Sequence, residues 1–260
     1  MEITRIKNIK DKLLDSMVGK YVLFDNTKLP PKHLRFCGKE FRDDDYFLTS
    51  AESEARRLAN FCNLSSASRV LDVGCGPGRL PIGILRLIGE VEKYRGVDVD
   101  RRVINWCRNH ITKGHRGFQF VHINVRNARY NPKGNRLLKG FKLPFRDGEF
   151  DIIYLFSVFS HMIIDELEIY VSEFCRMLDP GGKLFLTGFF EKNVPTMVAN
   201  PNGYRGKWRG ELHCVRYNID FFKDLLHRNG FAVERFDHGT EVDGQSSIYA
   251  SKQPKYTQVD

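Results

Sequence analysis

The sequence lacks the patterns that mark exported, disulfide-stabilised or zinc-binding proteins. Its six cysteines include no C-x-x-C pair and form no even framework, so neither a zinc site nor a disulfide scaffold is indicated. The N-terminal MEITRIKNIKDKLLDSM mixes charges throughout, and no run of about 18 uncharged apolar residues occurs that could span a membrane. We therefore expect a soluble, cytoplasmic protein with reduced thiols and no membrane span.

Acidic residues are absent from one long stretch. Residues 101–146 contain twelve lysines and arginines and no aspartate or glutamate, in a chain of net charge +9. Such a stretch raises the local positive potential and would attract nucleic acid, an anionic membrane surface or a phosphorylated or carboxylated substrate. A solvated basic face explains the same pattern, so the stretch alone selects no partner.

From residue 50 onward, apolar runs alternate with helical patterns, which predicts an α/β fold with a mainly parallel sheet covered on both faces. Seven strands are expected near residues 69–73, 94–98, 118–123, 151–156, 183–189, 231–236 and 246–250. Residues 160–178 show helical spacing that DPGG ends, and a second helix is expected between Asn218 and Gly230.

Two segments fall outside this alternation. We divide the chain into an N-terminal extension or cap (1–50), a main domain (51–252) and a tail (253–260). Within the main domain, residues 190–217 are rich in Gly, Pro and Asn, and a long irregular insertion of this kind is usually functional or disordered. We interpret it as a lid in which Tyr204, Arg205, Lys207, Trp208 and Arg209 face a substrate, although an ordered surface loop explains it equally well.

A glycine-rich loop follows the first strand of this domain, in RVLDVGCGPGRLPIGIL (residues 69–85). The third glycine, Gly78, comes four residues after Gly74, whereas the dinucleotide fingerprint requires it at the position of Arg79. No G-K-[ST] follows, so the loop is not a P-loop. The spacing therefore disfavours both NAD and nucleoside triphosphates.

Two aspartates indicate the ligand instead. Asp72 lies two residues before Gly74, where its charge would repel a pyrophosphate and attract a cation. S-adenosylmethionine carries an ammonium and a sulfonium and no phosphate, so it suits an acid beside bare backbone amides. Asp98 ends the second strand and is placed to accept both ribose hydroxyls.

With these motifs the sequence resembles the class I S-adenosylmethionine-dependent methyltransferases. VLDVGCGPG, GVDVD, FDIIYLFSVFSHM and LDPGGKLFLTGF occur in the family's order over roughly residues 50–252. The resemblance implies a Rossmann-like seven-stranded sheet with an antiparallel last strand, S-adenosyl-L-methionine as cofactor, S-adenosyl-L-homocysteine as product, and no metal. It also implies a set of cofactor-binding residues: Asp72, Gly74, Cys75, Gly76 and Gly78 around the methionine portion, Asp98 at the ribose, Val99, Asn124 and Val125 along the adenine, and Ser157 at the methionine end.

Asn124 departs from the family pattern, which often has an acid at this position. An asparagine carbonyl still accepts a hydrogen bond from the adenine amino group, without a charge.

Several signals are missing after the fourth strand, where substrates of the family meet the methyl group. The stretch LFSVFSHM contains no Asn/Asp-Pro-Pro-Tyr/Phe motif, no cysteine and no acidic cluster. These absences argue against methylation of adenine amines, covalent attack on pyrimidines and magnesium-dependent catechol chemistry. His161 is present instead, and its imidazole would take a hydroxyl proton or orient the substrate. A helix-start histidine satisfied by solvent or backbone is the alternative.

Three further residues are weaker candidates for a base: His213, Glu241 and Asp243, and for each of them a solvated loop position is the favoured interpretation. SVFSHM resembles bacterial methyltransferases of sugars, glycolipids and secondary metabolites. The sequence therefore favours methyl transfer to a small or medium-sized metabolite, at oxygen, with an anionic acceptor compatible with the basic stretch. The alternatives are an RNA methyltransferase that uses residues 101–146 and a cofactor-binding protein without turnover. Oligomeric state is not indicated.

Overall fold

The computed structural model describes residues 20–36, 38–241 and 243–254. Residues 1–19 of the expected extension, Cys37, residue 242 and residues 255–260 of the expected tail lie outside the described residues. The described N-terminal part contains a hairpin, β1 (Val22–Phe24) and β2 (Thr27–Leu29), and two 3₁₀ turns, Lys32–Leu34 and Glu40–Arg42. These precede the long helix α2 (Asp44–Cys62), which begins at the N-cap Asp43.

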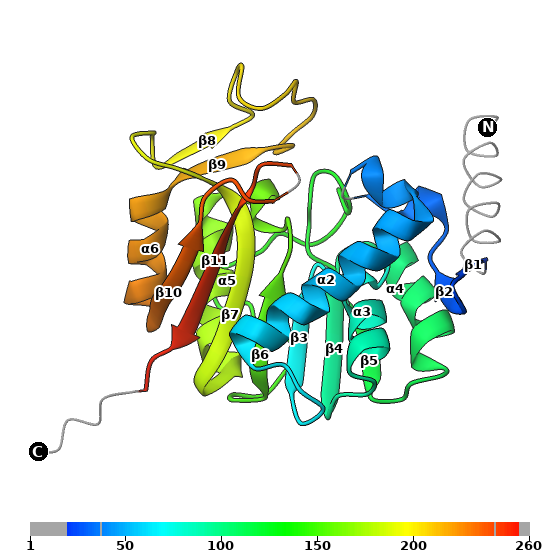
Figure 1. Cartoon of the computed structure of the whole chain (residues 1–260). Helices are drawn as coiled ribbons and strands as arrows, with labels where there is room; N and C mark the ends of the chain where they lie inside the picture. The colour runs from blue at the N-terminus through cyan, green and yellow to red at the C-terminus, as the bar shows by residue number, and fades with distance from the viewer. Residues whose placement is uncertain (1–19, 37, 242, 255–260) are drawn as a thin grey trace, which may run out of the picture.

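All seven predicted strands form one sheet (Figure 1). The seven are β3 (Arg69–Val73), β4 (Lys93–Asp98), β5 (Phe118–His122), β6 (Phe150–Leu155), β7 (Leu178–Glu191), β10 (Phe231–Asp237) and β11 (Ser246–Lys252). Two further short strands join the sheet at the end of β7, so within the described residues it has nine strands and not the seven expected. The order of the seven is β10-β11-β7-β6-β3-β4-β5, and β11 is antiparallel to both of its neighbours. The pairs formed by β3, β4, β5, β6 and β7 are parallel, so the predicted α/β fold with an antiparallel last strand is confirmed.

Helices cover both faces of the sheet because its strands alternate between two apolar faces. Val70 and Ile152 pack on the side covered by α2, α3 (Arg79–Leu87) and α4 (Arg101–Cys107), which a π-helical turn continues to Thr112. Leu71 and Ile153 pack on the side of α5 (Ile164–Met177) and α6 (Ile219–Arg228). In the part of the chain that the structure describes, none of these helices has the length and apolar character needed to cross a membrane.

The insertion 190–217 is more regular than its composition predicts. It contains β8 (Met197–Ala199) and the start of β9 (Val215–Asn218), and β9 pairs with both β8 and the end of β7. Val215 and Tyr217 are fully buried. The expectation of a wholly irregular segment was wrong because two strands of three and four residues are too short to show a periodicity in sequence.

Candidate active site

The glycine loop leads from β3 into α3, and all three of its glycines have positive φ: 74° at Gly74, 51° at Gly76 and 85° at Gly78. They are needed for different reasons. A Cβ at Gly74 would lie 2.4 Å from Val158 Cγ2, and one at Gly78 would lie 2.6 Å from Ile111 Cδ1, whereas at Gly76 nothing lies within 4 Å. Gly74 and Gly78 therefore allow close packing, while Gly76 presents bare backbone to open space, where a ligand can approach.

Asp98 lies beside this open space at the end of β4. Its Oδ2 accepts a hydrogen bond from the Gly76 N–H at 2.9 Å, and its Oδ1 accepts one from the Asp100 N–H at 2.8 Å. Burial raises the pKa of Asp98 to about 6. Each carboxylate oxygen still has a free lone pair, so Asp98 can accept two further hydrogen bonds from a diol.

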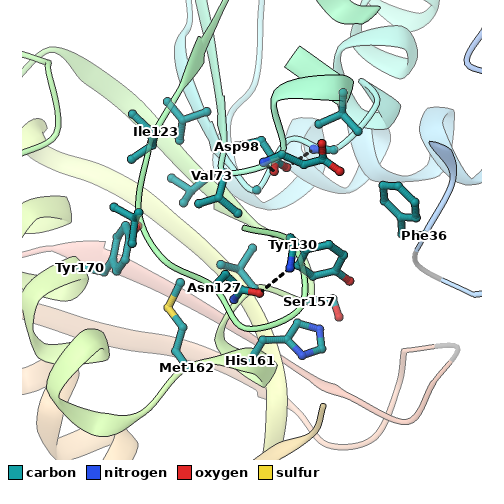
Figure 2. Close-up of a pocket in the computed structure, with 18 of the residues that line it drawn as sticks. Phe36, Val73, Asp98, Ile123, Asn127, Tyr130, Ser157, His161, Met162 and Tyr170 are labelled. Atoms are coloured by element: carbon teal, nitrogen blue, oxygen red, sulfur yellow. Dashed lines mark hydrogen bonds between the residues drawn. The ribbon is translucent and has the colours of Figure 1, made fainter. Parts of the chain in front are cut away.

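A cavity opens at the carboxyl ends of β3, β4, β5 and β6, the usual ligand site of such sheets. It encloses about 970 Å³ of space, including the part open to solvent. Figure 2 shows Asp98 and Val73 on one wall, with Tyr130, Ser157 and His161 grouped together on another. The lining also includes Gly74, Gly76, Val99, Val125, Phe36, Asn127, Leu137, Met162, Glu166 and Tyr170.

His161 belongs to a 3₁₀ turn, Phe159–His161, that follows β6. Its Nδ1 lies 3.1 Å from the Leu212 carbonyl oxygen. Because a carbonyl only accepts, Nδ1 carries the proton, and Nε2 of the neutral ring keeps its lone pair. Burial, with a smaller contribution from Arg129, lowers the pKa of His161 to about 4. The ring is therefore uncharged near neutral pH and offers a hydrogen-bond acceptor.

A second cavity adjoins the first and shares Gly74 and Gly76 with it. Asp72 lines this second cavity, where it accepts a hydrogen bond from the Tyr94 hydroxyl and where burial raises its pKa to about 7. Arg35 and Arg79 line the same space. A carboxyl group and two guanidinium groups around one cavity suit a ligand that carries both an ammonium and a carboxylate.

Some predicted cofactor residues lie elsewhere. Asn124 is exposed, its Oδ1 accepts a hydrogen bond from Asn131 Nδ2 at 3.1 Å, and it lines neither cavity, whereas Val125 lines the first. Cys75 lines only the second cavity, and Gly78, the N-cap of α3, lines neither.

None of the five residues predicted to face a substrate from the insertion lines either cavity. The Tyr204 hydroxyl donates to Glu191 Oε1 at 2.8 Å, and Trp208 Nε1 donates to the Tyr204 carbonyl at 2.7 Å. These contacts hold the insertion together at the end of β7. Two other residues of the insertion contact the cavity rim. The Leu212 carbonyl accepts the hydrogen bond from His161, and the Glu211 carboxylate accepts one from the Arg126 guanidinium at 3.3 Å.

The weaker base candidates are engaged away from the cavity. Glu241 is buried and pairs with Arg57 at 2.9 Å, so the solvated loop position expected for it was wrong. Asp243 accepts hydrogen bonds from the backbone and side chain of Gln245, and His213 contacts the Arg209 carbonyl at 2.8 Å. Within the ranges described, no three His, Cys, Asp or Glu residues are grouped so as to hold a metal ion.

Comparisons with known proteins agree with this architecture. A family profile described as a methyltransferase domain matches residues 71–186. The chain is 29% identical over 139 residues to the ribosomal protein L11 methyltransferase of Ralstonia nicotianae. This match covers 53% of this chain and 37% of that protein. The chain is also 24% identical over 208 residues to the O-methyltransferase rstn1 of Aspergillus nomiae. That match covers 79% of this chain and 83% of the Aspergillus protein.

Among solved structures, magnesium protoporphyrin IX methyltransferase from Synechocystis with bound SAM has a similar fold. The TM-score is 0.54 at 17% sequence identity, and the match covers 83% of each chain. The chain spans well under two thirds of the length of the Ralstonia protein, so the substrate of that protein indicates nothing about the substrate of this chain.

Proposed function

We propose that this chain, which carries a domain of the class I S-adenosylmethionine-dependent methyltransferases, transfers a methyl group to an oxygen atom of a small or medium-sized metabolite. One observation carries the proposal. A single cavity joins the open backbone at Gly76 and the carboxylate of Asp98 to His161, whose Nε2 is left as an acceptor.

The residues present fit S-adenosylmethionine and its product S-adenosylhomocysteine. Asp98 would accept the two ribose hydroxyls, and Val99 and Val125 would lie along the adenine. Asp72 would face the ammonium of the methionine portion, with Arg35 near its carboxylate, in the second cavity. When bound, the cofactor supplies a methyl group activated by the sulfonium.

His161 would orient a substrate hydroxyl by accepting its hydrogen bond at Nε2. A histidine of low pKa is a weak base toward a free hydroxyl, but the oxygen becomes far more acidic as it gains a bond to carbon. A neutral acceptor at the correct position is then enough to receive the proton. The similarity to an O-methyltransferase over 79% of this chain supports oxygen as the acceptor atom.

An anionic acceptor would meet basic groups at the cavity rim, beside the acidic Asp98, Asp100 and Glu166 that also line the cavity. Arg126 lines the cavity, and Arg129 acts electrostatically on His161. RNA methylation is a second candidate, because nearly all the basic residues of the stretch 101–146 are exposed and because Asn127 and Tyr130, from the same stretch, line the cavity. Binding of RNA would weaken steeply with salt.

The test is transfer of a labelled methyl group from S-adenosylmethionine to a library of hydroxylated metabolites and, in parallel, to total RNA. We expect label in metabolites, with anionic ones preferred, and much less with Asp98→Ala. Label in RNA alone would replace the proposal with the second candidate. Cofactor binding without transfer to any acceptor would indicate a binding protein without turnover.

A further inference from the structure

The backbone of Ser157 has a conformation that its side chain does not explain. Its φ is 58°, in the left-handed region that residues other than glycine rarely adopt. Ser157 follows the end of β6 and lines the main cavity beside His161 (Figure 2). Such a conformation persists only where the surroundings hold it, and it often lies at functional sites.

A closed ring of hydrogen bonds holds this residue. The Ser157 N–H donates to Thr187 Oγ1 at 2.8 Å, the Thr187 hydroxyl donates to Gln245 Oε1 at 3.0 Å, and Gln245 Nε2 donates to Ser157 Oγ at 2.7 Å. Thr187 is 0% and Gln245 1% exposed. The ring joins the end of β6, the middle of β7 and the loop before β11, three segments distant in sequence.

The donors and acceptors of this ring determine the direction of the Ser157 hydroxyl. One amide hydrogen of Gln245 is directed to Ser157 Oγ and the other to Asp243 Oδ2, at 2.5 Å. Ser157 Oγ is therefore an acceptor toward Gln245, and its own hydrogen must point elsewhere. Ser160 Oγ lies 3.3 Å from Ser157 Oγ, and either hydroxyl can donate in this contact. A ligand oxygen in the cavity would be the competing acceptor for the Ser157 hydrogen, with Ser160 then donating to the remaining lone pair of Ser157.

The loop that carries Gln245 is itself anchored in the protein interior. The Glu241 N–H donates to the Gln245 carbonyl at 3.0 Å, and the buried Glu241 carboxylate pairs with Arg57 of α2 at 2.9 Å. Gln245 is thus held from two sides, which is what an orienting group requires.

We propose that Gln245, acting through Ser157, is a positioning residue that keeps the Ser157 hydroxyl as a hydrogen-bond donor toward a ligand oxygen in the cavity. This inference rests on the proposed function. The ligand oxygen belongs either to the carboxylate of the cofactor's methionine portion or to the methyl acceptor, and both would accept the same hydrogen bond.

The test compares Gln245→Glu and Ser157→Ala with the double variant. A carboxylate at position 245 has no hydrogen to donate, so the Ser157 hydroxyl would turn back toward it and leave the ligand. For each single variant we expect cofactor affinity, or the KM for the acceptor, to worsen by about tenfold or more, which is the effect of losing one hydrogen bond. The double variant should be no worse than Ser157→Ala, because both changes remove the same interaction.

The ligands used are S-adenosylmethionine and S-adenosylhomocysteine in calorimetry, and the acceptor found by the transfer assay in kinetics. Weaker binding of both cofactor forms identifies the methionine carboxylate, whereas unchanged binding with a raised KM for the acceptor identifies the substrate. Gln119→Glu, the same change at an exposed position of β5, should change neither. Gln245→Met removes the hydrogen-bond donor without adding a charge, and it replaces Gln245→Glu in these measurements if that variant does not fold.

Two results would overturn the inference while leaving the proposed function intact. One is a double variant whose loss equals the product of the two single losses, and the other is a set of Gln245 variants with unchanged affinity and kinetics. A wild-type protein that binds neither cofactor form would instead overturn the proposed function itself.

Discussion

The two ends of the main cavity are built in different ways. At the end where we propose that the cofactor binds, the cofactor end, a short continuous segment of backbone around Gly76 faces one buried carboxylate, Asp98. At the end where we propose that the acceptor binds, the acceptor end, Tyr130 and His161 come from two segments far apart in the chain. The proposed cofactor-binding part therefore lies in a compact motif, while the surroundings of the proposed acceptor are assembled from separate loops.

The two ends also differ in charge. Asp98, with a pKa of about 6, is mostly ionised at neutral pH, whereas His161, with a pKa of about 4, is neutral. Cofactor binding should therefore depend on a negative charge, and acceptor binding on an uncharged hydrogen bond. A substitution at one end should therefore leave binding at the other end unchanged.

The largest effect is expected for His161→Ala. We predict a fall in turnover of about 1000-fold, within the usual range for loss of a general base, with affinity for S-adenosylmethionine unchanged. His161→Gln keeps a hydrogen-bonding group of similar reach and should retain more activity. Single-turnover kinetics and calorimetry measure the two quantities, and an unaltered rate would remove His161 from the mechanism.

Asp98→Ala should weaken S-adenosylmethionine binding about 100-fold, because two charge-assisted hydrogen bonds are lost together with the acceptor of the Gly76 N–H. Asp98→Asn retains one acceptor oxygen and should lose less. Thermal unfolding distinguishes lost binding from lost folding. Equal affinity in wild type and Asp98→Ala would show that the ribose does not lie there.

Acidification should separate the two ends. Asp98 becomes protonated as the pH falls through about 6, and Asp72, proposed to face the ammonium, as it falls through about 7. The affinity for S-adenosylmethionine should therefore drop by at least about tenfold between pH 7 and pH 5. His161 loses its acceptor lone pair only as the pH falls through about 4. With saturating cofactor, turnover should therefore stay nearly constant to pH 5, and a rate that follows a group titrating near pH 6.5 would contradict the buried, neutral histidine.

Gly76→Ala should weaken cofactor binding by about fivefold, because the added methyl group occupies the open space over the loop where the ligand approaches. The left-handed φ adds a cost of about 1 kcal/mol to folding, which does not change the affinity. Gly140→Ala is the matched control, since Gly140 has a φ of 89° and equally open surroundings in an exposed loop. Isothermal calorimetry should show unchanged affinity for the control, and equal effects of both changes would argue against a ligand at Gly76.

Much of the fold could be predicted because its signals are local. The apolar runs mark the seven strands, and the glycine spacing with Asp98 marks the loop. Asn124 illustrates the limit: this second residue after β5 was expected in the site together with Val125, but Ile123 and Val125 line the cavity and Asn124 does not. No pattern in one sequence encodes that difference.

The acceptor end shows the same limit more strongly. Tyr130 reaches the cavity only through the packing of loops around the sheet. Gln245 looks like an ordinary loop residue until folding places its amide 2.7 Å from Ser157 Oγ. Such long-range contacts depend on tertiary structure, which neither periodicity nor spacing reports.

The most direct test of the two-ended cavity is one set of calorimetric titrations of wild type, Asp98→Ala and His161→Ala with S-adenosylmethionine, S-adenosylhomocysteine and, as a control, NADH. We predict that wild type and His161→Ala bind both methionine-derived ligands with the same affinity, that Asp98→Ala binds them far more weakly, and that none binds NADH. Binding of NADH, or an Asp98→Ala variant with wild-type affinity, would contradict the assignment of the glycine loop and Asp98 to S-adenosylmethionine.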